Sequence, residues 1–164
     1  MAAKPLLLLV DDDAAFRTVM GAELSRSGYD VRTAASGEEA LAACARIEPQ
    51  IILLDLQMPG IDGLEVLKAL RAQQAPGEVV MLTGHGSIDT AIEAIRMGAF
   101  DYVSKPCPLD ELEIRIQRAL ERQSLKNRAD LLERGLTPPD LGSAFIGESA
   151  AFRGVLQLLD RVAQ

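Results

Sequence analysis

The sequence predicts an α/β fold, in which a doubly wound parallel sheet of five strands carries an extended C-terminal helix. Apolar runs such as Leu6–Val10 and Ile51–Leu54 each end on an acidic residue. Such runs are typical of strands that are buried on both faces of a parallel sheet. Strand-like and helix-like patterns alternate from Leu6 to about Leu120. This alternation favours a sheet with helices on both faces and a site at the carboxyl ends of its strands.

The expected strands are Leu6–Val10, Tyr29–Thr33, Ile51–Leu54, Val79–Leu82 and Asp101–Ser104. The expected helices are Ala14–Ser25, Ser36 to about Ile47, a helix that contains Leu64–Leu70, Ser87–Met97, and Pro108 to about Arg134. Three of these helices are followed by glycine or proline residues that are typical of helix ends, namely Gly28, Pro76-Gly77 and Gly98. Ser36 and Glu39 have the spacing of a capping box at the second helix.

The last helix is long for a domain of this size. About 27 residues at 1.5 Å each give about 40 Å, whereas a compact domain of about 120 residues is about 35 Å across, so we expect the helix to project. Beyond Arg122 the apolar positions thin to a seam of residues spaced four, three and four apart, namely Leu125, Ala129, Leu132 and Leu136. The seam fits a short coiled coil, and a solvated linker helix remains an equal alternative.

Composition limits the classes of function. The 164 residues, of which 48% are apolar and 25% charged, suit one domain with an appendage. No apolar run approaches the roughly 20 residues of a membrane span, and Met1–Pro5 has no signal-peptide pattern, so we expect a cytoplasmic protein. A net charge of −7 argues against direct nucleic-acid binding by this chain. Cys44 and Cys107 fit reduced thiols.

Acidic residues follow two of the expected strands. Asp11, Asp12 and Asp13 follow the first strand, and Asp55 follows the third. Two like charges about 4 Å apart repel by roughly 4 kcal/mol at an effective dielectric near 20, so such a cluster needs a cation. The sequence therefore predicts a cation site at this edge. His85, the only histidine, has no partner at ligand spacing and is interpreted as loop structure.

Further polar residues follow the fourth and fifth strands, namely the pair Thr83-Gly84 and the pair Lys105-Pro106. Together with the segment Leu54-Asp55-Leu-Gln-Met-Pro-Gly60, they stand in the order and spacing of a known family. From Lys4 to Arg122 the chain resembles the receiver domain of response regulators. The resemblance implies a flavodoxin-like sheet with strand order 2-1-3-4-5.

The same resemblance implies a phosphoryl-accepting site with Mg²⁺ as cofactor. Asp55 would be the phosphoacceptor, Asp12 a direct metal ligand, Asp11 a ligand through water, and Gln57 a ligand through its backbone carbonyl. Asp13 is expected to be a bystander that caps the first helix. The chemistry of the residues agrees, because a carboxylate accepts a phosphoryl group only where the charges of both are offset. Magnesium takes one or two carboxylates plus phosphate and water.

The resemblance also assigns the switch. Lys105 would pair with Asp55 before transfer and with phosphate oxygens afterwards. Thr83 would donate a hydrogen bond to the phosphoryl group, and Tyr102 would turn inward as Thr83 moves. The Lys105-Pro106 peptide can adopt the cis form typical of the family. The implied protein is a switch rather than an enzyme, with a sensor histidine kinase as donor and a homodimer as the expected assembly.

The C-terminal tail suggests a longer protein. Phe145–Ser149, followed by the helical stretch Phe152–Ala163, resembles the entry to the ATPase domain of nitrogen-regulatory, sigma-54-dependent activators. Glu148 replaces the lysine of a P-loop, so we expect no nucleotide binding by this segment. The expected organisation is a receiver over residues 1–122, a helical linker with a possible coiled coil over 123–142, and the start of an AAA+ domain over 143–164. AAA+ and DNA-binding domains would follow.

Three other functions deserve comparison. Asp11-x-Asp13 also fits the opening motif of haloacid-dehalogenase-type phosphatases, but no later paired-acid motif follows Lys105. A flavodoxin-like cofactor site needs a loop that cradles phosphate after the first strand, and three carboxylates there would repel it. The third alternative is a receiver that acts only as a phosphate-independent dimerisation module. Its complete set of site residues argues against it.

Overall fold

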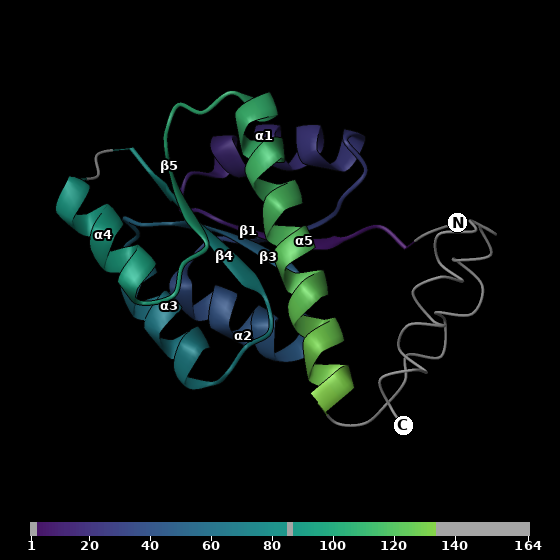
Figure 1. Ribbon diagram of the computed structural model, residues 1–164. Coiled ribbons are helices and arrows are strands. Elements are labelled where there is room, and N and C mark those ends of the chain that lie inside the picture. Colours follow the sequence, from purple (N-terminus) through teal and green to yellow (C-terminus); the bar gives the residue numbers. More distant parts are fainter. Residues whose placement is uncertain (1–2, 85–86, 134–164) are drawn as a thin grey trace, which may run out of the picture. The chain divides into compact units, whose positions relative to one another are not determined.

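A computed structural model describes residues 3–84 and 87–133 of the chain, which form five strands and five helices in strict alternation (Figure 1). The strands are β1 (Leu6–Val10), β2 (Asp30–Ala34), β3 (Ile51–Asp55), β4 (Glu78–Thr83) and β5 (Asp101–Ser104). The helices are α1 (Ala14–Arg26), α2 (Gly37–Ile47), α3 (Gly63–Ala72), α4 (Ile88–Arg96) and α5 (Leu109–Glu133). The α/β class is thus confirmed.

All strand pairs are parallel, and the sheet order is β2-β1-β3-β4-β5, as the resemblance implied. Val10 pairs with Leu54 at the junction of β1 and β3. The next residue on each strand is acidic, so the register itself brings Asp11 beside Asp55. Three of the predicted strands differ in their bounds, because β2 runs one residue later, from Asp30 to Ala34, β3 ends one residue later, at Asp55, and β4 extends by one residue at each end.

Side chains alternate between the two faces of the central strands and build two cores. One core contains Leu8, Ile52 and Met81 and is covered by residues of α2, α3 and α4. The other contains Leu9, Leu53 and Val80 and is covered by residues of α1 and α5. Figure 1 shows the same division of the helices between the faces of the sheet. The predicted arrangement of helices on both faces is therefore confirmed.

Side-chain caps fix the starts of the helices that flank the carboxyl edge. At α3, Asp62 and Glu65 form a full capping box, which the sequence analysis did not identify. At α2, the Ser36 side chain accepts a hydrogen bond from the Glu39 N–H, as expected. The Glu39 carboxylate accepts from the Ala35 N–H, one residue earlier than a capping box requires. The predicted box at Ser36 is therefore only half formed.

The C-terminal helix α5 runs for 25 residues, close to its predicted bounds. The chain divides into two compact units, residues 1–126 and residues 127–164. The first unit includes Gln123 and Lys126, which lie beyond the predicted receiver boundary at residue 122. Leu136 of the predicted seam and the predicted AAA+ segment, residues 143–164, lie outside the described residues, as does His85. Within residues 3–84 and 87–133, no helix is both long and apolar enough to cross a membrane.

Candidate phosphoacceptor site

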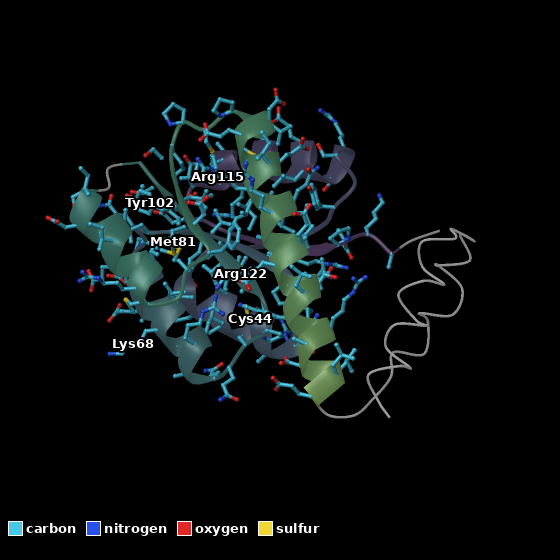
Figure 2. All side chains as sticks on the ribbon, in the orientation of Figure 1. Cys44, Lys68, Met81, Tyr102, Arg115 and Arg122 are labelled. Atoms are coloured by element: carbon cyan, nitrogen blue, oxygen red, sulfur yellow. The ribbon has the colours of Figure 1, made fainter. Side chains whose placement is uncertain are left out.

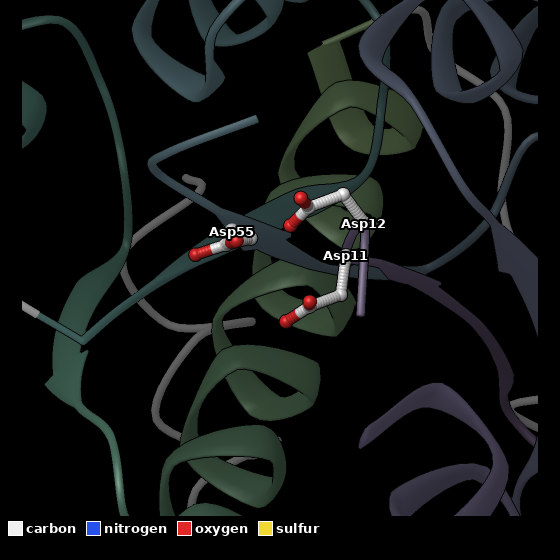
Figure 3. A group of neighbouring side chains, drawn as sticks. All are labelled: Asp11, Asp12 and Asp55. Atoms are coloured by element: carbon white, nitrogen blue, oxygen red, sulfur yellow. The ribbon is translucent and has the colours of Figure 1, made fainter. Parts of the chain in front are cut away.

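Three carboxylates meet at the carboxyl edge of the sheet (Figure 3). Asp11 and Asp12 follow β1, and Asp55 is the last residue of β3. One oxygen from each side chain lies within 4.8 Å of the other two. Asp11 is fully buried and Asp55 is only 4% exposed, whereas Asp12 faces solvent. Two of the three negative charges are thus shielded from water. Because they are buried, they need compensation by nearby positive charges or hydrogen-bond donors.

Lys105 supplies part of that compensation from the end of β5. Its Nζ lies 2.7 Å from Asp11 Oδ2 and 3.3 Å from Asp55 Oδ1, so one ammonium bridges both buried acids. The Lys105 N–H also donates to the Thr83 carbonyl oxygen at 2.6 Å, which fastens the lysine to the end of β4. The peptide bond between Lys105 and Pro106 is cis. The two distances from Nζ show that the lysine ammonium lies closer to Asp11 than to Asp55, its expected partner.

The ionisation of Asp55 and Lys105 reflects this crowding. Burial, and then the neighbouring Asp11 charge, raise the pKa of Asp55 above its ordinary value, although Lys105 and the Gln57 N–H oppose the shift. Burial lowers the pKa of Lys105, but its hydrogen bond to Asp11 and the charges of both acids outweigh burial and raise it. Lys105 is thus held as a cation, and the Asp55 carboxylate still carries uncompensated repulsion.

The donor set fits Mg²⁺. Three carboxylates and one ammonium leave a net charge of −3 + 1 = −2 in the cluster, which one divalent cation balances. Magnesium prefers oxygen ligands and keeps several waters, and the exposed Asp12 leaves room for them. Gln57, whose carbonyl is the fourth predicted ligand, follows β3 on the same edge and is exposed.

The third acid of the run has a different role. Asp13 is the N-cap of α1, and its Oδ1 accepts hydrogen bonds from the N–H groups of Ala15 and Phe16 at 2.8 and 3.1 Å. The capping role predicted for Asp13 is confirmed. Its carboxylate points to the helix rather than to the acidic cluster, which contains Asp11, Asp12 and Asp55 among the described residues.

The two predicted switch residues lie on neighbouring strands. Thr83 ends β4 and is 1% exposed, and Tyr102 on β5 pairs with Met81 in the register (Figure 2). Tyr102 is half-buried, and among the described residues its buried hydroxyl has no hydrogen-bond partner. A buried polar group without a partner is unfavourable, so this ring is held in its position by packing rather than by its hydroxyl.

Sequence reasoning did not identify two residues of α1 that reach this edge. The Phe16 ring lies with its centroid 4.7 Å from Lys105 Nζ. Arg17 Nη1 donates to the backbone carbonyl of Asp11 at 2.6 Å. Phe16 has the spacing of an ordinary core residue and Arg17 that of a surface charge, so their positions in the sequence gave no signal of these contacts.

Comparison with known proteins agrees with this geometry. Residues 7–117 match the family described as response regulator receiver domain. The chain is 38% identical over 137 residues to the regulatory protein AtoC of Escherichia coli K12, covering 84% of this chain and 30% of AtoC. It is 32% identical over 159 residues to the DNA-binding transcriptional regulator NtrC of Salmonella typhimurium, covering 97% of this chain and 33% of NtrC.

Solved structures give the same result. A response regulator receiver domain protein of Clostridium thermocellum superimposes with a TM-score of 0.71 at 31% identity, over 74% of this chain and 98% of that protein. The crystal structure of NtrX from Brucella abortus in complex with ADP superimposes with a TM-score of 0.74 at 35% identity, over 98% of this chain and 34% of NtrX.

The fold, the acidic edge and these similarities define a class, the aspartate-based receiver switches. The chain belongs to the response regulator receiver domain family. It spans about a third of the length of the curated relatives that it matches.

Proposed function

We propose that this chain is the phosphoacceptor switch of a two-component system, in which Asp55 takes a phosphoryl group from a sensor histidine kinase. The observation that carries the proposal is the cluster of Asp11, Asp12 and Asp55, with Lys105 bridging the two buried acids. Family membership over residues 7–117 supports it. The function is that of a switch in the cytoplasm rather than of a metabolic enzyme, since the phosphoryl group would end on the protein itself.

In the proposed reaction, an oxygen of the Asp55 carboxylate attacks phosphorus. A P–O bond forms as the bond from phosphorus to the donor's histidine nitrogen breaks, and the nitrogen keeps the electron pair. Asp11, Asp12, Asp55 and the Gln57 carbonyl would hold Mg²⁺, which supplies charge neutralisation at the phosphoryl oxygens when bound. Lys105 needs to move only from the carboxylates to the incoming oxygens, because its Nζ already lies 3.3 Å from Asp55.

The conformational response would pass through Thr83 and Tyr102. Thr83 ends the strand beside β3 and would donate its hydroxyl to the phosphoryl group. Tyr102 would then respond as the aromatic switch, because its hydroxyl, which is already buried in this structure, has no hydrogen bond to the described residues that would hold it. Tyr102 also lines a surface hollow of about 430 Å³ between α4 and β5, so its rotation would reshape that surface.

The α4, β5 and α5 surface is the proposed output face. Ile88, Ile92 and Ile95 of α4 are 80%, 45% and 47% exposed, and a group of exposed apolar side chains marks an interaction surface. In the complete protein this face would set the geometry of a homodimer and so restrain or release an attached sigma-54-dependent AAA+ activator with its DNA-binding domain. The similarity to AtoC and NtrC supports this placement.

The phosphatase alternative is disfavoured by one contact. A haloacid-dehalogenase-type mechanism would use Asp13 as general acid, and here the Asp13 carboxylate accepts two backbone N–H bonds at the start of α1. Those bonds commit the Asp13 side chain to the cap of α1, and it is not part of the acidic cluster found among the described residues. A phosphoacceptor role for Asp55 makes no such demand on Asp13.

The proposal is tested by intact mass spectrometry after incubation with acetyl phosphate, with and without Mg²⁺. We expect a gain of one phosphoryl group that needs Mg²⁺ in the wild type and is absent in Asp55→Asn. A folded wild type that stays unlabelled in every condition would point instead to a phosphate-independent dimerisation module. Release of phosphate over many turnovers would support a phosphatase.

The proposed dimer is tested on the linker. Leu125 and Leu132 are each 66% exposed on α5. Apolar side chains that pack against a second copy of the chain are expected to be exposed in the single chain. The double substitution Leu125→Glu and Leu132→Glu should weaken self-association in sedimentation equilibrium. Because Gln123 and Lys126 belong to the first compact unit, a truncation should end after Lys126 rather than near Arg122. Equal association of these variants and the wild type would remove the coiled coil from the proposal.

A further inference from the structure

The ammonium of Lys105 has acidic neighbours and one aromatic neighbour. Asp11 and Asp55 provide the carboxylates at 2.7 and 3.3 Å. The ring of Phe16, on the first turn of α1, lies 4.7 Å from the same nitrogen, measured to its centroid. An ammonium within about 6 Å of a ring centroid is attracted by the negative face of the π system. The side chain of Lys105 is only 19% exposed, so water weakens this attraction little.

The position of Phe16 is fixed by the acidic segment itself. Its N–H donates to Asp13 Oδ1 at 3.1 Å, and the next residue, Arg17, donates to the Asp11 carbonyl oxygen at 2.6 Å. The ring is also partly buried against the core beneath α1 and α5. The backbone that carries Asp11 therefore also holds the ring that faces Lys105.

We propose that Phe16 is a positioning residue for Lys105, and that its ring sets the rate at which Asp55 is phosphorylated. The inference rests on the proposed function. The contacts to Asp11 and Asp55 alone would draw the ammonium toward the closer acid, Asp11. The ring provides a third, uncharged attraction that keeps Nζ within reach of both, where the phosphoryl oxygens must arrive. Because the ring has no formal charge, it does so without competing for the phosphoryl group or the metal.

The ordinary alternative is that Phe16 only fills the core. Two substitutions separate the roles, since Phe16→Leu keeps an apolar side chain without a π face and Phe16→Tyr keeps the face. Positioning predicts that the leucine variant is slower and the tyrosine variant is close to wild type. Core filling predicts that the leucine variant changes stability without changing the rate of phosphorylation of the folded protein.

The chain also offers a matched control. Arg122 lies over the Phe100 ring with its Cζ 5.6 Å from the centroid, and Phe100 precedes β5 at the opposite edge of the sheet. Phe100→Leu makes the same chemical change at a second cation–π pair. It should leave the phosphorylation rate unchanged.

The experiment measures the rate of labelling of the full chain by acetyl phosphate with Mg²⁺, by intact mass, at a temperature where circular dichroism shows every variant folded. We expect Phe16→Leu to be slower by about threefold to tenfold, the range of a half-buried cation–π contact, with Phe16→Tyr and Phe100→Leu near wild type. In parallel, carbon–proton NMR of the Lys105 ε-methylene should show a ring-current shift that Phe16→Leu removes and Phe16→Tyr retains.

The outcomes separate the inference from the proposed function. If the wild type is not labelled, the proposed function fails. If the wild type is labelled and Phe16→Leu matches its rate, or Phe16→Tyr falls as far as the leucine variant, the positioning role is wrong. An absent ring-current shift in the wild type would also overturn it, and that readout does not depend on the stability of any variant.

Discussion

Glu78 and Lys126, 48 residues apart in the sequence, form an ion pair between the start of β4 and α5. Glu78 is 1% exposed, and Arg122 Nε lies 3.8 Å from the same carboxylate oxygen. Gln123 Nε2 adds a hydrogen bond to the Pro76 carbonyl oxygen at 3.2 Å. The pair lies at the edge of the sheet opposite Asp55. It therefore fastens α5 to the domain without taking part in the phosphoacceptor site.

Removing either partner should destabilise the fold unequally. Lys126→Met leaves a buried carboxylate with the longer Arg122 contact and the nearby charge of Arg71, and we expect a loss of about 2 kcal/mol. Glu78→Gln leaves Lys126 and Arg122, which are about half exposed and regain water, so the loss should be about 1 kcal/mol. Urea denaturation measures both losses.

Lys68, an exposed lysine of α3 (Figure 2), provides the control for this comparison. Lys68→Met should change the free energy of unfolding by less than about 0.5 kcal/mol, as surface substitutions usually do. A Lys126→Met variant no less stable than Lys68→Met would show that the ion pair adds nothing to stability.

The adjacent acids Asp12 and Asp13 should separate function from stability. Asp12→Asn removes a predicted metal ligand and relieves repulsion in the cluster, so Mg²⁺-dependent labelling should be lost while the free energy of unfolding stays equal or rises. Asp13→Ala removes the α1 cap and should cost about 1 kcal/mol with labelling retained. Labelling rates and urea titrations of the two variants test this, and the opposite pattern would exchange the two roles.

Two glycines should respond in opposite directions to the same substitution. A Cβ on Gly63 would overlap the Asp55 carbonyl oxygen and lie 2.9 Å from the Leu56 Cα, so Gly63→Ala should destabilise by about 1 to 3 kcal/mol and slow phosphorylation. On Gly21, within α1, a Cβ meets nothing closer than 3.9 Å. Gly21→Ala should therefore stabilise by about 0.5 to 1 kcal/mol. Thermal unfolding of both variants checks the signs, and a stabilising Gly63→Ala would contradict the close approach.

Cys44 should make stability fall at high pH. Burial raises the pKa of this thiol from 9.0 to about 11. Between these values the unfolded chain releases the proton and the folded chain keeps it, so the free energy of unfolding decreases as pH rises. Below pH 9 both states are protonated and the thiol contributes no slope. In urea titrations across pH 9 to 11, Cys44→Ala should show a shallower decline than the wild type, and identical slopes would refute the shift.

The sequence predicted the sheet and the acidic edge well, because the signals there are local. Apolar runs that end on Asp11 and Asp55 mark strand ends directly, and Asp13 before a helical pattern predicts a cap. The Glu39 contact was predicted one residue away from its observed position. Local spacing defines which side chain faces a helix start, but not which of two neighbouring N–H groups it reaches.

The contacts that the sequence did not predict join residues that are far apart along the chain. In the sequence, Glu78 is simply the polar residue before an apolar run. Its contact with Lys126 depends on the fold, which brings α5 to the start of β4. The spacing of Phe16 predicts an ordinary core residue of α1. Its contact with Lys105 depends on the fold, which brings the end of β5 to the acidic edge. Neither partner is marked by spacing in the sequence.

We propose that Asp55, rather than another acid of the cluster, carries the phosphoryl group. The most direct measurement is borohydride reduction of the chain labelled with acetyl phosphate and Mg²⁺, which converts a phosphorylated aspartate to homoserine, followed by peptide mass mapping. We expect homoserine at residue 55 alone. Homoserine at residue 11, 12 or 13, with residue 55 unchanged, would contradict it.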